Sequence, residues 1–169
     1  MDLGIVDERT IAAHAKESEE TGKGDSFKYA WVMDNIKDER ARWITIDLAF
    51  QKFETPKYFF TLIDAPGHRD FVKNMITGAS ESDCAVLVLS AKEGETDTAI
   101  AAGGQAREHA FLLKTLGVKQ IVVAVNKMDD SKFSEDAYKA VVEKGSALVK
   151  SVGYKIDDCL LYTSPSPRD

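Results

Sequence analysis

Two short stretches of the sequence carry side chains suited to binding a nucleotide. The first, Asp-Ala-Pro-Gly-His at 64–68, lies between an apolar run at 58–63 and a helix-like segment that begins at Arg69. A carboxylate, a glycine and a histidine at the carboxyl end of a buried strand are the groups that a nucleotide hydrolase places beside a terminal phosphate. Pro-Gly after a strand is also typical of an ordinary turn, so this stretch alone leaves both interpretations open.

The second stretch is Asn-Lys-Met-Asp at 126–129, which follows another apolar run at 120–125. Taken alone, it would be interpreted as a polar turn at the end of a strand. Two such loops at the carboxyl ends of two strands can face one ligand. The pair therefore favours a ligand site over two unrelated turns.

Hydrophobic periodicity predicts the elements that must position these loops. Three near-continuous apolar runs, at 58–63, 84–89 and 120–125, alternate with segments of helical spacing. This pattern is typical of a mostly parallel sheet covered by helices on both faces, so the sequence predicts an α/β doubly wound domain. Helices are expected at 7–21, 27–42, 68–77, 105–116 and from Ser134 to a stop at Gly153, with a polar loop at 92–105.

A hairpin is predicted to lead into the first site loop. Residues 44–53 have strand character, and a short connection that contains Pro56 joins them to the run at 58–63. Such a short connection favours an antiparallel pair in which 48–53 forms an edge of the sheet. The hairpin would deliver Asp64 to the end of the sheet.

Composition sets the broad class of protein. With 169 residues, 44% hydrophobic and 30% charged, the chain suits one globular domain with a substantial core. The net charge of −6 argues against a broad contact surface for nucleic acid or membrane. The sequence shows neither a signal-peptide pattern nor an apolar run of spanning length, so no membrane association and a cytoplasmic location are expected. Of the two cysteines, Cys84 and Cys159, the first is expected to act as a small hydrophobe.

Gly-Lys-Gly-Asp-Ser at 22–26 is not interpreted as a phosphate loop. Such a loop needs a glycine, four further residues and Gly-Lys-Ser/Thr after a strand, so that backbone amides surround the phosphates. Here Glu17 takes the place of the first glycine, Gly24 replaces the hydroxyl residue, and a helix is expected upstream. The stretch is predicted to be a simple loop.

Together with the two site stretches, four further segments resemble the nucleotide-binding domain of the elongation factor 1-alpha family of translational GTPases, which has a P-loop NTPase-type fold. They are FKYAWVMD at 27–34, ERARWITID at 39–47, APGHRDFVKNMITGAS at 65–80 and GQAREHAFLLKTLGVKQ at 104–120. The resemblance covers 4–158, which we interpret as a partial GTPase domain. The long insert at 7–42 and the extended loop at 92–105 are similar to the archaeal and eukaryotic type.

The resemblance implies GTP and GDP as ligands, with the base bound at 126–129. Asp129 would accept two hydrogen bonds from guanine, from N1–H and from the exocyclic amine, whereas adenine has an acceptor at N1 and would leave the carboxylate unpaired. Asn126 would contact the edge of the base. The aliphatic stem of Lys127 would cover the plane of the base.

The resemblance also implies roles at the phosphate end. Asp64 would hold Mg²⁺ through a water, and Thr45 would place its hydroxyl on the same ion with its backbone near the γ-phosphate. The amide of Gly67 would bond the γ-phosphate, which the missing side chain allows to approach closely. His68 would orient the attacking water, so His68 and Thr45 are the expected catalytic residues.

By the same resemblance, the parent protein would deliver aminoacyl-tRNA to the ribosomal A site and hydrolyse GTP. Its partners would be aminoacyl-tRNA, the ribosome and a guanine-nucleotide exchange factor. Two alternatives remain open at this point. One is a termination or ribosome-rescue GTPase paralogue, and the other is a non-enzymatic binding fragment or an artefact.

The sequence departs from the family pattern in three places. Trp43 stands where the family has glycine, and its bulky side chain would hinder closure of the neighbouring loop that carries Thr45. The family's first strand and phosphate loop would precede Gly4, and its fifth element would follow Asp158, but neither pattern occurs in the 169 residues. Residues 159–169 begin like a short strand and are expected to be a non-native or disordered tail, with disorder from Thr163 onward.

The isolated 169-residue polypeptide is therefore expected to bind GTP weakly or not at all, because the amides, lysine and hydroxyl that grip the β-phosphate in such folds are missing from it. Titration calorimetry of this polypeptide with GTP and Mg²⁺ tests the expectation. A dissociation constant below about 1 μM, roughly −8 kcal/mol of binding free energy, would contradict it.

Overall fold

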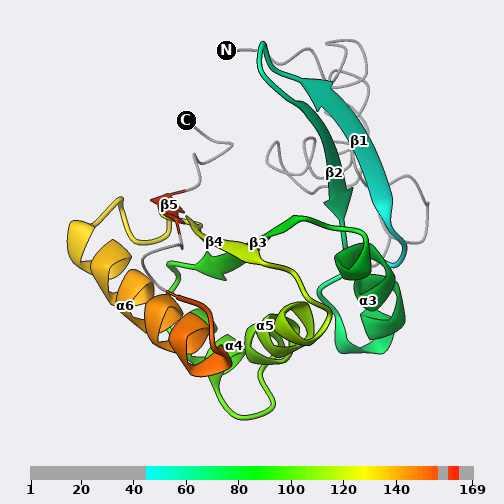
Figure 1. Cartoon of the computed structure of the whole chain (residues 1–169). Helices are drawn as coiled ribbons and strands as arrows, with labels where there is room; N and C mark the ends of the chain where they lie inside the picture. The colour runs from blue at the N-terminus through cyan, green and yellow to red at the C-terminus, as the bar shows by residue number, and fades with distance from the viewer. Residues whose placement is uncertain (1–44, 156–159, 164–169) are drawn as a thin grey trace, which may run out of the picture. The chain divides into compact units, whose positions relative to one another are not determined.

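The computed structural model describes residues 45–155 and 160–163, within a chain that forms two compact units, one up to Gly78 and one from Ala79 (Figure 1). Each unit is described by itself. The predicted helices at 7–21 and 27–42, the loop at 22–26 and Trp43 lie outside the described residues.

The first unit contains the predicted hairpin. Strand β1 (Ala49–Glu54) pairs antiparallel with β2 (Phe59–Asp64), so that Ala49 lies opposite Asp64. The Thr55 amide donates to the carbonyl of Tyr58 at 2.8 Å, and this bond closes the connection. A 3-10 turn η3 (Arg69–Phe71) and helix α3 (Val72–Ser80) follow. The hairpin therefore ends its second strand at the first site loop, as predicted.

Close packing of α3 on this hairpin depends on Gly78. A Cβ atom at this position would lie 2.7 Å from Cδ2 of Leu48 and 3.1 Å from Cγ2 of Ile63. A Cβ at this position would therefore require the Leu48 and Ile63 side chains to shift, and glycine lets the helix pack against them as they lie.

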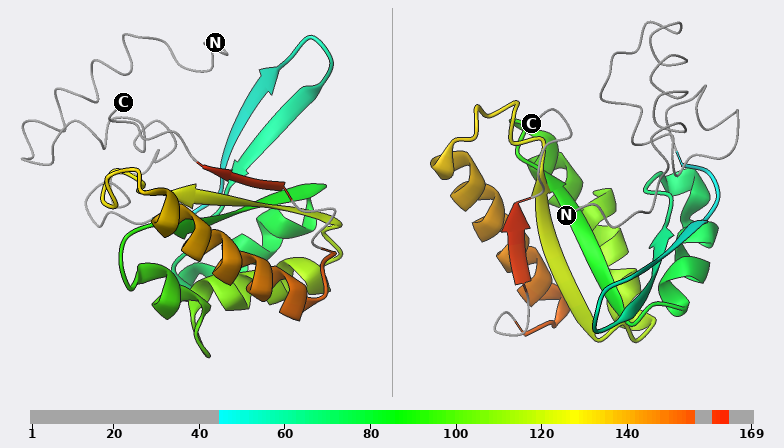
Figure 2. Two further views of the ribbon diagram at one scale, coloured as in Figure 1. Left: turned by 90° about the vertical axis from the view of Figure 1, so that its left-hand side faces the viewer. Right: turned by 90° about the horizontal axis from the view of Figure 1, so that it is seen from above.

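The second unit is a parallel sheet of strand order β3-β4-β5, formed by β3 (Cys84–Ser90), β4 (Gln120–Asn126) and β5 (Leu160–Thr163). Helices α4 (Glu95–Ile100), α5 (Gln105–Thr115) and α6 (Glu135–Val152) lie on one face of this sheet in both figures (Figures 1 and 2). The buried apolar side chains of the sheet and α6 form the core, and they include Leu87, Leu89, Ile121, Val123, Val125, Leu148 and Val149.

This arrangement confirms the predicted α/β class with a parallel sheet, and it differs from the prediction in detail. Among the described residues β2 pairs only with β1, so the three apolar runs do not share one sheet. Within the second unit, the described helices cover one face of the sheet, and on β3 Val86 and Val88 are 59% and 56% exposed while the alternate residues face the core. Cys84 is also exposed, which corrects the expectation of a small buried hydrophobe.

Two further segments were predicted incompletely. Residues 160–163 form β5 by pairing in register with β4, with Val125 opposite Thr163, so the expectation of disorder from Thr163 onward is wrong at that residue. The predicted loop at 92–105 contains the short helix α4, whose buried Thr96 is anchored by a 2.6 Å hydrogen bond from its hydroxyl to the carbonyl of Ser90. Within the described residues, no helix is long and apolar enough to cross a bilayer.

His109 in helix α5 has a different pKa in the folded state than in the unfolded chain. Burial lowers the pKa of the half-buried His109, and the neighbouring carboxylate of Glu108 opposes this shift. The folded state therefore favours the neutral imidazole relative to the unfolded chain, in which the pKa is about 6.5.

We expect stability to fall as the pH decreases through 6.5 toward the lower pKa of the folded state, because the unfolded chain takes up the proton first. The full-length protein should melt at a lower temperature at about pH 5.5 than at about pH 7.5, two values on either side of that ordinary pKa. His109→Gln should make this difference smaller. Thermal unfolding at the two pH values measures this, and an undiminished difference would count against His109.

Candidate functional site

The loop at 126–129 begins where β4 ends. The carbonyl of Asn126 accepts a 2.8 Å hydrogen bond from the amide of Ala91, which follows the neighbouring strand β3. Asn126 also lies opposite Ser90 in the register of the two strands. The segments that follow β3 and β4 therefore begin at the same edge of the sheet, as the sequence predicts for parallel strands.

A compact turn fixes the rest of this loop. Lys127 adopts a left-handed backbone conformation with φ of 58°, which is uncommon for a residue with a side chain. Met128 is only 4% exposed, and its carbonyl accepts from the hydroxyl of Ser131 at 2.8 Å and from the amide of Phe133 at 2.8 Å. Met128 thus anchors the loop, while Asn126 and Asp129 are half-buried and Lys127 is exposed.

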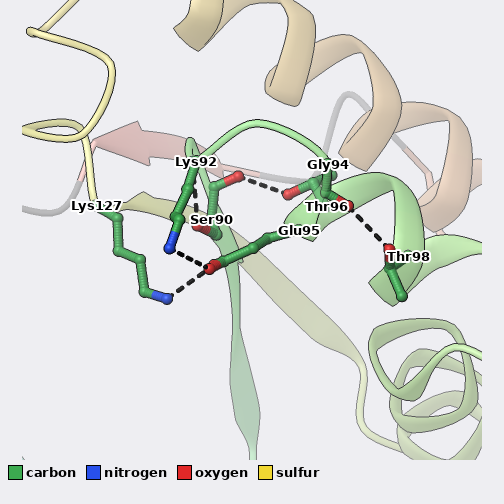
Figure 3. A network of polar contacts seen from close by, with 7 residues as sticks. All are labelled: Ser90, Lys92, Gly94, Glu95, Thr96, Thr98 and Lys127. Atoms are coloured by element: carbon green, nitrogen blue, oxygen red, sulfur yellow. Dashed lines mark hydrogen bonds and ion pairs between the residues drawn. The ribbon is translucent and has the colours of Figure 1, made fainter.

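The Lys127 ammonium is held by a carboxylate that sequence reasoning did not single out. Its Nζ lies 2.7 Å from Oε2 of Glu95, the first residue of α4, and Nζ of Lys92 lies 3.4 Å from Oε1 of the same side chain (Figure 3). The pKa of Glu95 is lowered to about 2, mainly by the hydrogen bond from Lys127 and to a smaller extent by one from Ser90. The carboxylate therefore stays charged at neutral pH.

The loop at 64–68 belongs to the first unit and follows β2. Pro66 is buried, whereas Gly67 is exposed and a Cβ built on it would meet nothing within 4 Å. Gly67 is not among the residues with positive φ in the described structure. Neither packing nor backbone conformation therefore explains glycine at this position.

His68 caps the turn η3. Its Nδ1 accepts a 3.2 Å hydrogen bond from the amide of Asp70. Nδ1 also lies 3.6 Å from Oδ2 of Asp70, which is too far for a hydrogen bond. A nitrogen that accepts a hydrogen bond carries no proton. The Asp70 amide therefore selects the tautomer with the proton on Nε2, which can donate to a ligand or a water.

Thr45 precedes β1 in the same unit. The carbonyl of its neighbour Ile46 accepts a 2.7 Å hydrogen bond from the side-chain amide of Asn74 on α3. This bond ties the half-buried Thr45 segment to a helix. The hydroxyl of Thr45 and the carboxylate of Asp64 are hard oxygen donors of the kind that Mg²⁺ prefers, so their chemistry fits the implied ion. Within 45–155 and 160–163, no group of three or more His, Cys, Asp or Glu side chains is arranged to hold a metal ion.

The predicted residues thus form two sets. Thr45, Asp64, Gly67 and His68 belong to the first unit, and Asn126, Lys127 and Asp129 to the second. In the first set, Asp64, Gly67 and His68 lie at or after the end of β2, and Thr45 precedes β1. The second set lies at and after the end of β4.

The second unit also has a pocket of about 430 Å³ that involves neither set. It lies between the segment after β3 and the start of α6, and its polar lining includes Lys92, Asp97, Asp130, Ser134 and Lys144. Asn126, Lys127 and Asp129 do not line it, so it is distinct from the predicted base site.

A parallel α/β sheet with a polar loop at the carboxyl end of a strand is typical of nucleotide-binding domains. The chain belongs to the family of the elongation factor Tu GTP binding domain, whose model matches residues 3–164. This family assignment makes guanine nucleotides the ligands of the domain.

Curated relatives share the name elongation factor 1-alpha. The protein of Cenarchaeum symbiosum is 86% identical over 158 residues, which are 94% of this chain and 36% of the relative. That of Ignicoccus hospitalis is 55% identical over 93% of this chain and 36% of the relative, and that of Aureobasidium pullulans is 58% identical over 89% and 33%. The chain thus spans about a third of the length of these relatives.

Solved structures agree on the fold. Sup35 complexed with GMPPNP is 31% identical, with a TM-score of 0.56 over 91% of this chain and 33% of its own. The GTPase-like domain of S. cerevisiae Ski7, bound to GDP and inorganic phosphate, has a TM-score of 0.74 over 96% of this chain and 38% of its own. At 19% identity, Ski7 supports the fold alone.

Proposed function

We propose that this chain supplies part of the GTP-binding and GTP-hydrolysing domain of a translation elongation factor that delivers aminoacyl-tRNA to the ribosomal A site. The loop at 126–129 carries the proposal, because its residue types and its place at the end of β4 suit a guanine base in a chain 86% identical to an elongation factor 1-alpha. Aminoacyl-tRNA, the ribosome and a nucleotide exchange factor are the proposed partners, and the cytoplasm is the proposed location.

Base recognition is assigned to the second unit. Asp129 accepts hydrogen bonds from N1–H and the exocyclic amine of guanine, and Asn126 contacts the edge of the base. The stem of Lys127 covers the base plane. Adenine is rejected because it would leave the half-buried carboxylate facing an acceptor.

Phosphate chemistry is assigned to the first unit. Asp64 and Thr45 would hold Mg²⁺, and this ion would supply positive charge beside the phosphates. The Gly67 amide donates to the γ-phosphate, which accounts for a glycine that the fold itself does not require. His68 orients the attacking water through Nε2, because Nδ1 is engaged by the amide of Asp70.

A termination or ribosome-rescue paralogue is the weaker alternative. The relatives of 55% to 86% identity described above are all named elongation factor 1-alpha. A non-enzymatic role would leave the combination of an unexplained Gly67 and the 126–129 loop without a purpose.

The base assignment is tested by Asp129→Asn in the full-length protein. The amide can donate to the C2 oxygen of xanthine but cannot accept two bonds from guanine, so preference should move from GTP toward xanthosine triphosphate by a factor on the order of 10² or more. Binding titrations with both nucleotides measure this. Asp130→Asn, at the exposed neighbouring position, is the control and should retain GTP preference. Unchanged selectivity of Asp129→Asn would refute the assigned role.

The phosphate assignment is tested by Gly67→Ala. The added methyl group meets open space in the protein, so the melting temperature should be unchanged or slightly raised. Affinity for a non-hydrolysable GTP analogue should fall about 10-fold to 100-fold, because the added methyl group keeps the γ-phosphate from the amide and their hydrogen bond is lost. GDP affinity is the internal control and should stay constant, since GDP has no γ-phosphate. Equal losses for both nucleotides would argue against this role.

A further inference from the structure

Glu95 occupies a position to which neither the sequence motifs nor the proposed mechanism gives a role. Its carboxylate lies between two ammonium groups, 2.7 Å from that of Lys127 and 3.4 Å from that of Lys92 (Figure 3). Lys127 belongs to the loop at 126–129, which is proposed to bind the guanine base. Glu95 itself lies 32 positions earlier in the chain, so a separate segment reaches across to that loop.

The segment that carries Glu95 is fixed to the sheet. Gly94 supplies a left-handed turn with φ of 78° directly before it, and Thr96 directly after it is buried and hydrogen-bonded to the carbonyl of Ser90 at 2.6 Å. The adjacent Ala91 amide donates to the carbonyl of Asn126 at 2.8 Å. Hydrogen bonds therefore tie the segment that carries Glu95 to the ends of β3 and β4.

Lys127, in contrast, has a long side chain that is half exposed, on a backbone with φ of 58°. A free lysine of this kind samples many rotamers, and ordering it costs conformational entropy. An ion pair with a fixed carboxylate selects one set of rotamers before any ligand arrives. The ion pair thus reduces the conformational entropy that the Lys127 side chain loses when the nucleotide binds.

We propose that Glu95 is a positioning residue that holds Lys127 in place over the base of the bound guanine nucleotide. This inference rests on the proposed function, because Lys127 acts on the base only if the loop at 126–129 binds guanine. The pKa of Glu95, lowered to about 2, is consistent with a carboxylate that keeps this role throughout the neutral range. Lys92 shares the carboxylate and makes a longer, weaker contact.

The test measures release of a fluorescent GDP analogue from the full-length protein by stopped flow. Glu95→Gln should accelerate release about twofold to fivefold, the range set by an exposed ion pair. Glu93→Gln, which removes a neighbouring exposed carboxylate from the same segment, is the matched control and should release the analogue at the wild-type rate. Glu95→Asp keeps the charge on a shorter side chain and should lie between wild type and Glu95→Gln.

A double-mutant cycle separates positioning from a general structural effect. In a Lys127→Met background, which keeps an apolar stem and removes the ammonium, Glu95→Gln should change release by a factor close to one. The same acceleration in both backgrounds would overturn the proposal, and so would wild-type release by Glu95→Gln. Failure of the wild-type protein to bind the analogue would instead overturn the proposed function. Thermal unfolding of each variant verifies folding, and a Glu95→Gln protein that fails to fold would assign Glu95 to stability and overturn its positioning role.

Discussion

The position of the loop at 126–129 depends on the register of β3 against β4. Cys84 lies opposite Gln120 and Ser90 opposite Asn126, so both strands end together. This register also turns Leu89 and Val123 into the core. A shift by one residue would turn alternate side chains outward, and the apolar burial lost would be on the order of 1.5–3 kcal/mol for each. Burial of apolar side chains therefore decides where the polar residues after each strand are placed.

The glycines show how packing and function can be told apart. A side chain at Gly78 or Gly104 would collide with neighbouring atoms, and one at Gly145 would lie 3.0 Å from Leu89 and 3.2 Å from Val123. These three glycines allow segments to approach one another. Gly67 has no such neighbours, and this contrast separates it from glycines that serve the fold.

Local signals made much of this structure predictable. Ser134 accepts a bond from the amide of Ala137 at the start of α6, and Gly153 ends that helix in a left-handed conformation, as expected from their residue types. The strand ends that carry the two site loops followed from runs of apolar residues. The Glu95–Lys127 pair could not be predicted in this way, because it depends on a left-handed Lys127 and on strand register rather than on local sequence. Helix α4 was missed since its small and polar residues are also typical of loops.

The strand order has a consequence for local opening of the backbone. Strand β4 is hydrogen-bonded on both sides, by β3 and β5, whereas β1 and β2 pair only with each other among the described residues. Amides of a central strand commonly exchange with solvent only in the largest opening events, and an isolated two-stranded hairpin is marginally stable. The loop at 126–129 thus follows a strand that is hydrogen-bonded on both sides, and the loop at 64–68 follows a strand that is hydrogen-bonded on one side among the described residues. In the proposed assignment, the strand that is hydrogen-bonded on both sides carries the loop for the base, and the two-stranded hairpin carries the loop for the γ-phosphate.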